Sequence, residues 1–274
     1  MERKSPRRCS LFLIVALAFG GIGCAKLKAR DMLNKGVQSY RDGQFERAIE
    51  YFKQAKELDP TLTNARLYLA TAYASQFIPG APSDENVRQG QQAIQEFKEV
   101  LDADPKNLTA IDGIGSMLYQ MGGTPYDPKK FEESKKYHEM HISLRPGDPE
   151  PYYWIGLIDW SLAYRGNKQL RADYNAKGKK PVKDDDPMPP AVRDDFQSQY
   201  GAIVDEGVTN LKKAIDLRPD YDDAMAYLNL LYRQKADLES DTEARNNDIK
   251  LADELVEKVK EIKQKKMENP EAKS

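Results

Sequence analysis

Four prolines recur along this chain, and each follows the end of a helix-length amphipathic segment. They are Pro60, Pro105, Pro146 and Pro219. A small residue precedes each of them, at Gly36, Ala70, Gly115 and Gly156. A proline cannot continue a helix, and a small residue lets two helices approach closely. The pattern therefore predicts one helical hairpin used repeatedly, which builds a stacked array that presents surface and rarely carries chemistry.

The spacing of the small residues indicates where the repeats are enlarged. Gly36 and Ala70 are 34 residues apart, and the next two intervals are 45 and 41 residues. We interpret the first interval as the bare hairpin and the longer ones as hairpins with loops inserted between their helices. Segment 29–62 is the clearest unit, with Gly43 in its turn and Phe52 on the inward stripe of its second helix.

This segment resembles the tetratricopeptide repeat (TPR), a helix-turn-helix unit of 34 residues. The residues at the family's signature positions are Gly36, Gly43, Ala48, Phe52, Ala55 and Pro60. The resemblance implies an all-α fold, an α-solenoid of about five TPR-like hairpins over residues 29–267. We expect insertions between the helices of the hairpins, a capping helix from about residue 241 to 267, and a disordered tail at 268–274.

The longest insertion is predicted at residues 165–190, where the sequence has little periodicity. We interpret it as a solvated loop, and a flap that contacts a partner is the main alternative. A calcium site on the aspartates at 184–186 is the weakest interpretation, because the alternating ligands and central glycine of an EF-hand are missing. Pro189 and Pro190 are expected to begin the long helix that follows.

The N-terminus has the parts of a bacterial export signal. A basic segment, residues 1–8, precedes the apolar run 11–23, which is too short to span a membrane stably. The residues Gly21-Ile22-Gly23-Cys24 resemble the lipobox of bacterial lipoproteins. The resemblance implies a signal peptide, residues 1–23, that is removed before Cys24, and acylation of Cys24 itself.

This reading sets the expected location of the protein. Residues 24–28 would form a short lipidated linker between the membrane and the first helix. Ala25, rather than Asp, follows Cys24, and by the sorting pattern of such lipoproteins this favours the outer membrane, facing the periplasm. We therefore expect a protein of the cell envelope, held at the membrane through lipidated Cys24.

Composition and motifs argue against several function classes. The 42 Lys and Arg residues are balanced by 44 Asp and Glu residues, so no nucleic-acid partner is expected. His138 and His141 share a helix face, but repeat alignment places them where side chains pack between helices. The sequence has no glycine-rich phosphate loop after a strand and no nucleophile-elbow motif. We therefore expect no enzyme activity, no cofactor and no metal.

The TPR resemblance also implies a binding surface on the first helix of each hairpin, whose inner positions line the concave groove of the array. In this chain these positions hold Leu33, Tyr40, Arg41, Leu67, Asp112, Tyr119, Tyr153, Leu157, Trp160, Leu230 and Arg233. Tyr, Trp and Arg are the residue types that dominate binding hot spots. We expect a membrane-anchored scaffold or adaptor that docks a protein or peptide partner in this groove.

Two other functions stay open. One is a small-molecule-binding protein or an enzyme with its site under the 165–190 insertion, which would show as a buried cluster of convergent polar side chains. The other is a purely architectural homo-oligomer, in which the last helix pairs with a second copy of itself.

Overall fold

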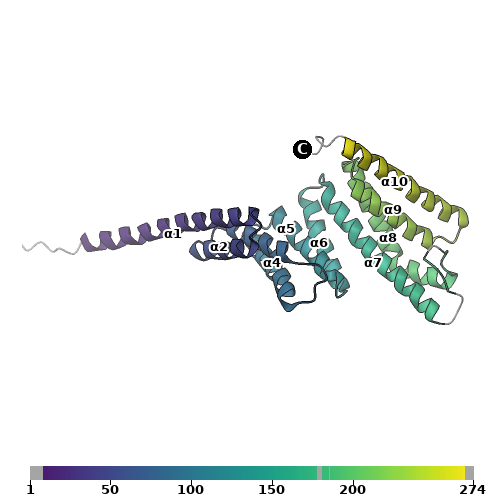
Figure 1. Ribbon diagram of the computed structural model, residues 1–274, viewed down its shortest axis with the longest axis horizontal. Helices are drawn as coiled ribbons and strands as arrows, with labels where there is room; N and C mark the ends of the chain where they lie inside the picture. Colours follow the sequence, from purple (N-terminus) through teal and green to yellow (C-terminus); the bar gives the residue numbers. More distant parts are fainter. Residues whose placement is uncertain (1–8, 178–180, 185, 269–274) are drawn as a thin grey trace, which may run out of the picture. The chain divides into compact units, whose positions relative to one another are not determined.

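The structure is a computed structural model that describes the backbone of residues 9–177, 181–184 and 186–268, and side chains from residue 23 onward. Ten α-helices and no strand occur in the described ranges (Figure 1). The number of helices agrees with the five predicted hairpins. Their contacts divide the predicted 29–267 array into two compact units, with unit 1 ending at Asp127 and unit 2 beginning at Pro128.

Unit 1 contains the helices α1 (Cys9–Arg41), α2 (Phe45–Leu58), α3 (Thr63–Gln76), α4 (Asp84–Ala103) and α5 (Leu108–Gly123). Helices that follow one another in the chain pack together. Gly43, in the turn between α1 and α2, has a φ of +73°, which lies in the left-handed region that favours glycine. Gly36 lies directly against the ring of Phe52, and a Cβ at Gly36 would overlap that ring. These contacts confirm the roles that the repeat pattern predicts for both glycines.

The inserted loop between α3 and α4 is held by side chains. Ser83 caps α4 and accepts a hydrogen bond from the backbone N–H of Asn86 at 3.2 Å. Asn86 is buried, and its side chain bonds both the N–H of Ile78, at 2.7 Å, and its carbonyl oxygen, at 2.9 Å. The insertion in this hairpin is therefore a fixed loop that extends the repeat without changing its helices.

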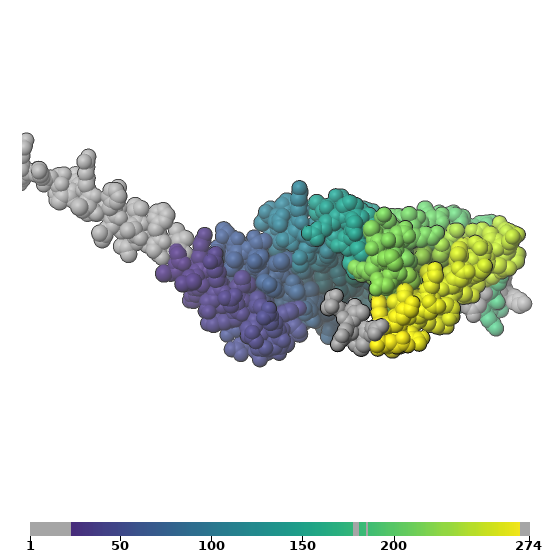
Figure 2. Space-filling view, turned by 90° about the horizontal axis from the view of Figure 1, so that it is seen from above, coloured from purple at the N-terminus to yellow at the C-terminus, as the bar shows by residue number. Residues whose placement is uncertain are grey.

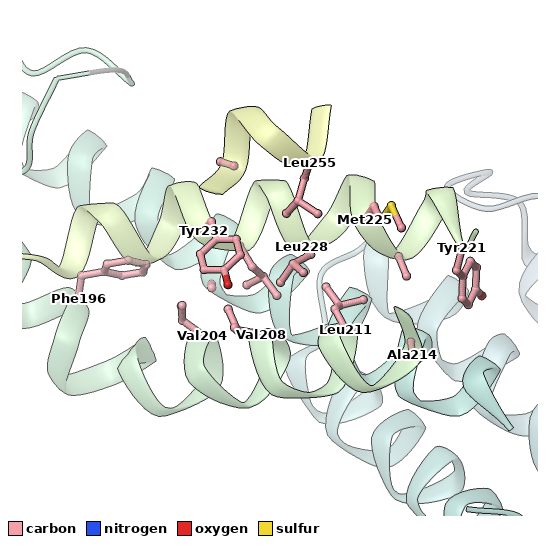
Figure 3. Packing of buried hydrophobic residues seen from close by; sticks show 14 of the residues in the cluster. Phe196, Val204, Val208, Leu211, Ala214, Tyr221, Met225, Leu228, Tyr232 and Leu255 are labelled. Atoms are coloured by element: carbon pink, nitrogen blue, oxygen red, sulfur yellow. The ribbon is translucent and has the colours of Figure 1, made fainter. Parts of the chain in front are cut away.

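Unit 2 contains α6 (Pro128–Leu144), α7 (Pro149–Ala176), α8 (Pro190–Leu217), α9 (Asp222–Leu238) and α10 (Thr242–Glu268). Figure 3 shows Val204 and Val208 of α8 facing Leu228 and Tyr232 of α9, with Leu255 of α10 on the other side of α9. In the space-filling view α10 lies along α9 (Figure 2). The final helix predicted at about 241–267 is confirmed.

The predicted 165–190 loop is wrong for its first half. Residues 165–176 continue α7, and the connection to α8 runs from 177 to 189. The helix continues because Gly166, Asn167 and Arg171 lie buried along one side of it. A Cβ at Gly166 would overlap the ring of Tyr200 on α8, so the two helices pack closely along this extension. Helix α8 begins at Pro190, as predicted.

Residues 24–28 do not form the predicted linker. Helix α1 runs without a break from Cys9 to Arg41, and these residues lie inside it. The stretch is rich in Ala, Leu and Lys, which are strong helix formers, and it contains no proline or glycine that would end the helix. Cys24 is exposed on this helix.

Parts of the N-terminal and C-terminal predictions lie outside the described residues. Positions 1–8 of the predicted signal peptide and positions 269–274 of the predicted tail are among them. In the part of the chain that the structure describes, no helix combines the length and the apolar character that crossing a membrane requires.

Candidate protein-binding surface

Four aromatic side chains form a continuous strip across two helices of unit 2. Tyr153, Trp160 and Tyr164 lie on α7 at spacings of seven and four residues, which place them on one face of the helix. Tyr227 of α9 lies against them. We call these four residues the aromatic strip. Helix α7 is set in place by its N-cap, Asp148, whose carboxylate accepts a hydrogen bond from the N–H of Glu150 at 3.0 Å.

The rings of the strip touch in sequence. The ring centroids of Tyr153 and Tyr227 are 5.9 Å apart, those of Trp160 and Tyr227 are 5.2 Å apart, and those of Trp160 and Tyr164 are 5.3 Å apart. Tyr153, Trp160 and Tyr227 also pack against the core of unit 2 and are partly buried, whereas Tyr164 is 40% exposed. Rings supported in this way are ordered before a partner arrives, so little entropy is lost on binding.

Each end of the strip carries a cation that the protein itself neutralises. The Arg218 guanidinium lies 4.3 Å from the ring centroid of Tyr221, whose own ring is 5.1 Å from that of Tyr153. Arg218 and the Tyr221 hydroxyl both donate to Glu150, at 2.8 and 2.7 Å. Burial and this bond to a carboxylate raise the pKa of Tyr221, so it stays a neutral donor.

At the other end, the Lys168 ammonium lies 5.4 Å from the Tyr164 ring centroid and forms an ion pair with Asp184 in the 177–189 connection. The hydrogen bond with Asp184 raises the pKa of Lys168. One of the two cation–π contacts, that of Lys168, lies on a ring of the strip, and the other lies on Tyr221, a buried ring next to Tyr153.

Some of the predicted groove residues of unit 2 lie together at the surface, and one of them is buried instead. Tyr153 and Trp160 lie in the strip, and Leu230 is partly exposed three residues beyond Tyr227 on α9. Leu157 is only 4% exposed, so its assignment to the groove is corrected: it lies between the two aromatic residues on α7 but turns toward the interior. Arg233 pairs with Asp253 of α10 at 2.6 Å, away from the strip.

The predicted groove residues of unit 1 form a separate set. Leu33 and Tyr40 of α1 pack partly buried against the unit 1 core, and the Tyr40 hydroxyl is 2.7 Å from that of Ser75 on α3. Arg41 is exposed at the end of α1. The remaining predicted positions of this unit are partly exposed, and they are Leu67, Asp112 and Tyr119.

Tyr164 and Tyr227 belong to the strip although the groove prediction did not include them. Tyr164 follows Trp160 by one helical turn, a spacing that the sequence displays openly. Tyr227 has no such signal, because its place in the strip depends on how α9 packs on α7.

The two histidines confirm their predicted packing role. The His138 ring is fully buried and lies parallel to the Trp154 indole, with centroids 5.6 Å apart and 2° between their planes. Burial lowers the pKa of His138 to about 4, so the ring is neutral at pH 7. His141 is also buried, and its Nε2 is 3.5 Å from a carboxylate oxygen of Asp148. Across the described residues, no group of three or more His, Cys, Asp or Glu side chains is placed to hold a metal ion.

A partly buried ion network joins three helices of unit 2. Lys135 of α6 is 2.9 Å from an oxygen of Asp159 on α7 and 2.7 Å from one of Glu206 on α8. Burial raises the pKa of Asp159 to about 7 despite the nearby ammonium. Burial opposes the charge of Lys135, but the two carboxylates raise its pKa overall. The network fastens α6 and α8 to α7.

A second buried network lies under the 177–189 connection, where the small-molecule alternative places its site. The Arg171 guanidinium donates to Asn167, to the carbonyl oxygens of Lys183 and Asp186, and to Asp237 of α9. All three of its nitrogens are therefore used within the protein. The convergent polar cluster that would mark a ligand site exists, but it acts as a latch that ties the connection to α7 and α9.

Comparison with known proteins supports the same fold. Residues 29–62 match the family described as "Tetratricopeptide repeat". Among solved structures, residues 41 to the end of MamA from Desulfovibrio magneticus RS-1 are 19% identical with a TM-score of 0.55, covering 87% of this chain and 96% of that one. Another crystal structure of MamA is 16% identical with a TM-score of 0.57, covering 88% and 94%.

A third similar structure is YrrB, described as a TPR protein with an unusual peptide-binding site. It is 16% identical with a TM-score of 0.51, covering 88% of this chain and 90% of YrrB. No curated protein matches the sequence. At these identities the likeness concerns the fold, and it confirms the predicted all-α class of TPR solenoids.

Proposed function

We propose that this protein is a membrane-anchored scaffold of the bacterial cell envelope, which docks a partner polypeptide on the aromatic strip. The observation that carries the proposal is the strip itself: four touching aromatic rings, partly exposed, on the first helices of two successive hairpins. Large aromatic side chains supply most of the binding energy at protein interfaces. The scaffold acts by binding and has no catalytic role.

The fold supports a polypeptide as the ligand. A TPR hairpin array exposes long helix faces that suit an extended or helical segment of another protein. YrrB, which shares the fold, is described as having a peptide-binding site. The small-molecule alternative is less favoured, because the polar groups under the 177–189 connection are hydrogen-bonded to one another by way of Arg171.

The anchor is the second part of the proposal. Cys24 is exposed, and it directly follows the apolar run that resembles a lipoprotein signal. Because α1 continues through residues 24–28, acyl chains on Cys24 would be joined rigidly to unit 1 rather than through a flexible linker. Attachment to the outer membrane, on its periplasmic side, would confine the search for a partner to the membrane surface and raise its effective concentration.

Affinity capture from solubilised membranes tests the binding part. The double variant Tyr153→Ala with Trp160→Ala should lose a protein that the unaltered chain retains. Tyr68→Ala is the matched control, because Tyr68 is also 40% exposed but lies on α3 and stacks on Phe52. Equal capture by all three forms would reject the strip as the docking surface.

Mass spectrometry of the membrane-extracted protein tests the anchor independently. The expected mature chain begins at Cys24 and carries acyl groups, and Cys24→Ser should remain uncleaved and unacylated. A chain that begins elsewhere, or a Cys24 without lipid, would reject the anchor and leave the docking surface to be judged by the capture experiment.

A further inference from the structure

The aromatic strip is flanked on α9 by an exposed carboxylate. Asp223 precedes Tyr227 by four residues, so the two lie on one face of the helix. Asp223 is exposed and takes part in no hydrogen bond or ion pair with the described part of the chain.

An exposed carboxylate beside aromatic faces adds a negative charge to a surface that already attracts cations. The protein's own cations illustrate the preference: Arg218 lies over Tyr221, next to the strip, and Lys168 lies over Tyr164, within it. Each is neutralised by a carboxylate of the chain, Glu150 and Asp184 respectively, so neither compensates Asp223.

We infer that the strip takes a segment of the partner polypeptide that carries lysine or arginine. The cation lies against the aromatic rings and donates to the Asp223 carboxylate. The inference rests on the proposed docking function and adds the charge of the partner to it.

The experiment uses the full mature chain in detergent and three fluorescently labelled peptides that differ only at two positions, which hold arginine, glutamine or glutamate. Fluorescence anisotropy should show the arginine peptide binding most tightly and the glutamate peptide most weakly. Asp223→Asn should lower the affinity for the arginine peptide about fivefold, in the range of a single cation contact, and leave the affinity for the glutamine peptide unchanged. Asp223→Lys should reverse the order of the arginine and glutamate peptides.

Asp216→Asn is the control, since Asp216 is an exposed aspartate on α8, beside Ile262 of α10 rather than at the strip. An arginine peptide that binds no better than the glutamine peptide, or that does not bind, overturns the inference. If the peptides bind equally and all are lost with Trp160→Ala, the docking surface stands and only the charge preference fails. If the capture experiment is insensitive to Tyr153→Ala with Trp160→Ala, the docking function itself fails.

Discussion

The indole of Trp160 on α7 meets the phenol ring of Tyr227 on α9 edge to face, with ring centroids 5.2 Å apart and 61° between the ring planes. Edge-to-face pairs of this kind contribute roughly 0.5–1.5 kcal/mol beyond the area that they bury. The contact joins the first helices of two successive hairpins, so it both stabilises unit 2 and orders the surface proposed to bind a partner.

Removing Trp160 should therefore affect both binding and folding, and the two effects are measured separately. We expect Trp160→Ala to weaken binding of the partner by more than about 2 kcal/mol, as at other interface hot spots. Trp160→Phe should keep most of the affinity. The measurement is a titration with the captured partner, alongside thermal unfolding of each variant. The interpretation fails if Trp160→Phe and Trp160→Ala lose the same affinity with unchanged folding.

Gly156 is expected to be essential for the packing of α7 on α8. A Cβ at this position would overlap the side chain of Leu211, which is fully buried in the unit 2 core. Gly156→Ala should lower the free energy of unfolding by about 1–3 kcal/mol, the usual cost of overpacking a core. Gly147→Ala is the control, because a Cβ there would meet no atom within 4 Å. Equal denaturation midpoints for the two variants would contradict the close approach.

The same glycine shows why the fold could be predicted well from sequence. Gly36 and Gly156 stand where two helices touch, and their side-chain neighbours Phe52 and Leu211 leave no room for a Cβ. A requirement of this kind appears in the sequence as a small residue at a recurring position, so the hairpins and most of their helix ends could be inferred directly.

The extension of α7 could not be predicted in this way. Its buried side consists of Gly166, Asn167 and Arg171, which carry no hydrophobic periodicity, so the segment resembles a loop. Arg171 is buried because it pairs with Asp237 and with the backbone of the 177–189 connection, and these partners are distant in the sequence. The aromatic strip was half predicted for the same reason, since Tyr227 reaches it only through tertiary packing.

The hydrogen bonds of Arg171 are expected to hold the 177–189 connection in place. Arg171→Ala removes the donors that hold the carbonyl oxygens of Lys183 and Asp186, and it leaves the Asp237 carboxylate with Asn167 as its remaining partner. We expect a loss of about 3 kcal/mol in stability, as when one partner of a buried ion pair is removed. Backbone hydrogen exchange in residues 181–184 should also become faster.

Lys168→Gln provides the comparison for the latch. Its ion pair with Asp184 lies at the surface, and such pairs contribute no more than about 1 kcal/mol. Equal exchange rates in the Arg171 and Lys168 variants would show that the buried network does not hold the connection.

Acid should destabilise unit 2 through His138. Its pKa is lowered from 6.5 to about 4 in the folded protein, so between these values the unfolded chain binds more protons. Protonation of His138 therefore costs no stability above pH 6.5. As the pH falls toward 4, it lowers the free energy of unfolding by up to about 3 kcal/mol. The raised pKa of Asp159 has the opposite effect, because it makes the folded protein more stable as the pH falls. This effect is present in both proteins and cancels when the native chain is compared with His138→Phe.

The check is the difference in unfolding free energy between the native chain and His138→Phe at pH 7 and at pH 4.5. We expect His138→Phe to gain stability relative to the native chain on acidification. A difference that is independent of pH would mean that His138 does not titrate as its burial requires.

Site-specific photo-crosslinking tests the central claim most directly. A photoreactive amino acid placed at Tyr164, on the exposed end of the aromatic strip, should capture a partner polypeptide in intact cells, and the same group at the equally exposed Tyr68 should not. A single crosslinked protein seen only from position 164, and lost when Trp160→Ala is added, is the result that the account predicts. A crosslink from position 68 alone, or from neither position, would contradict it.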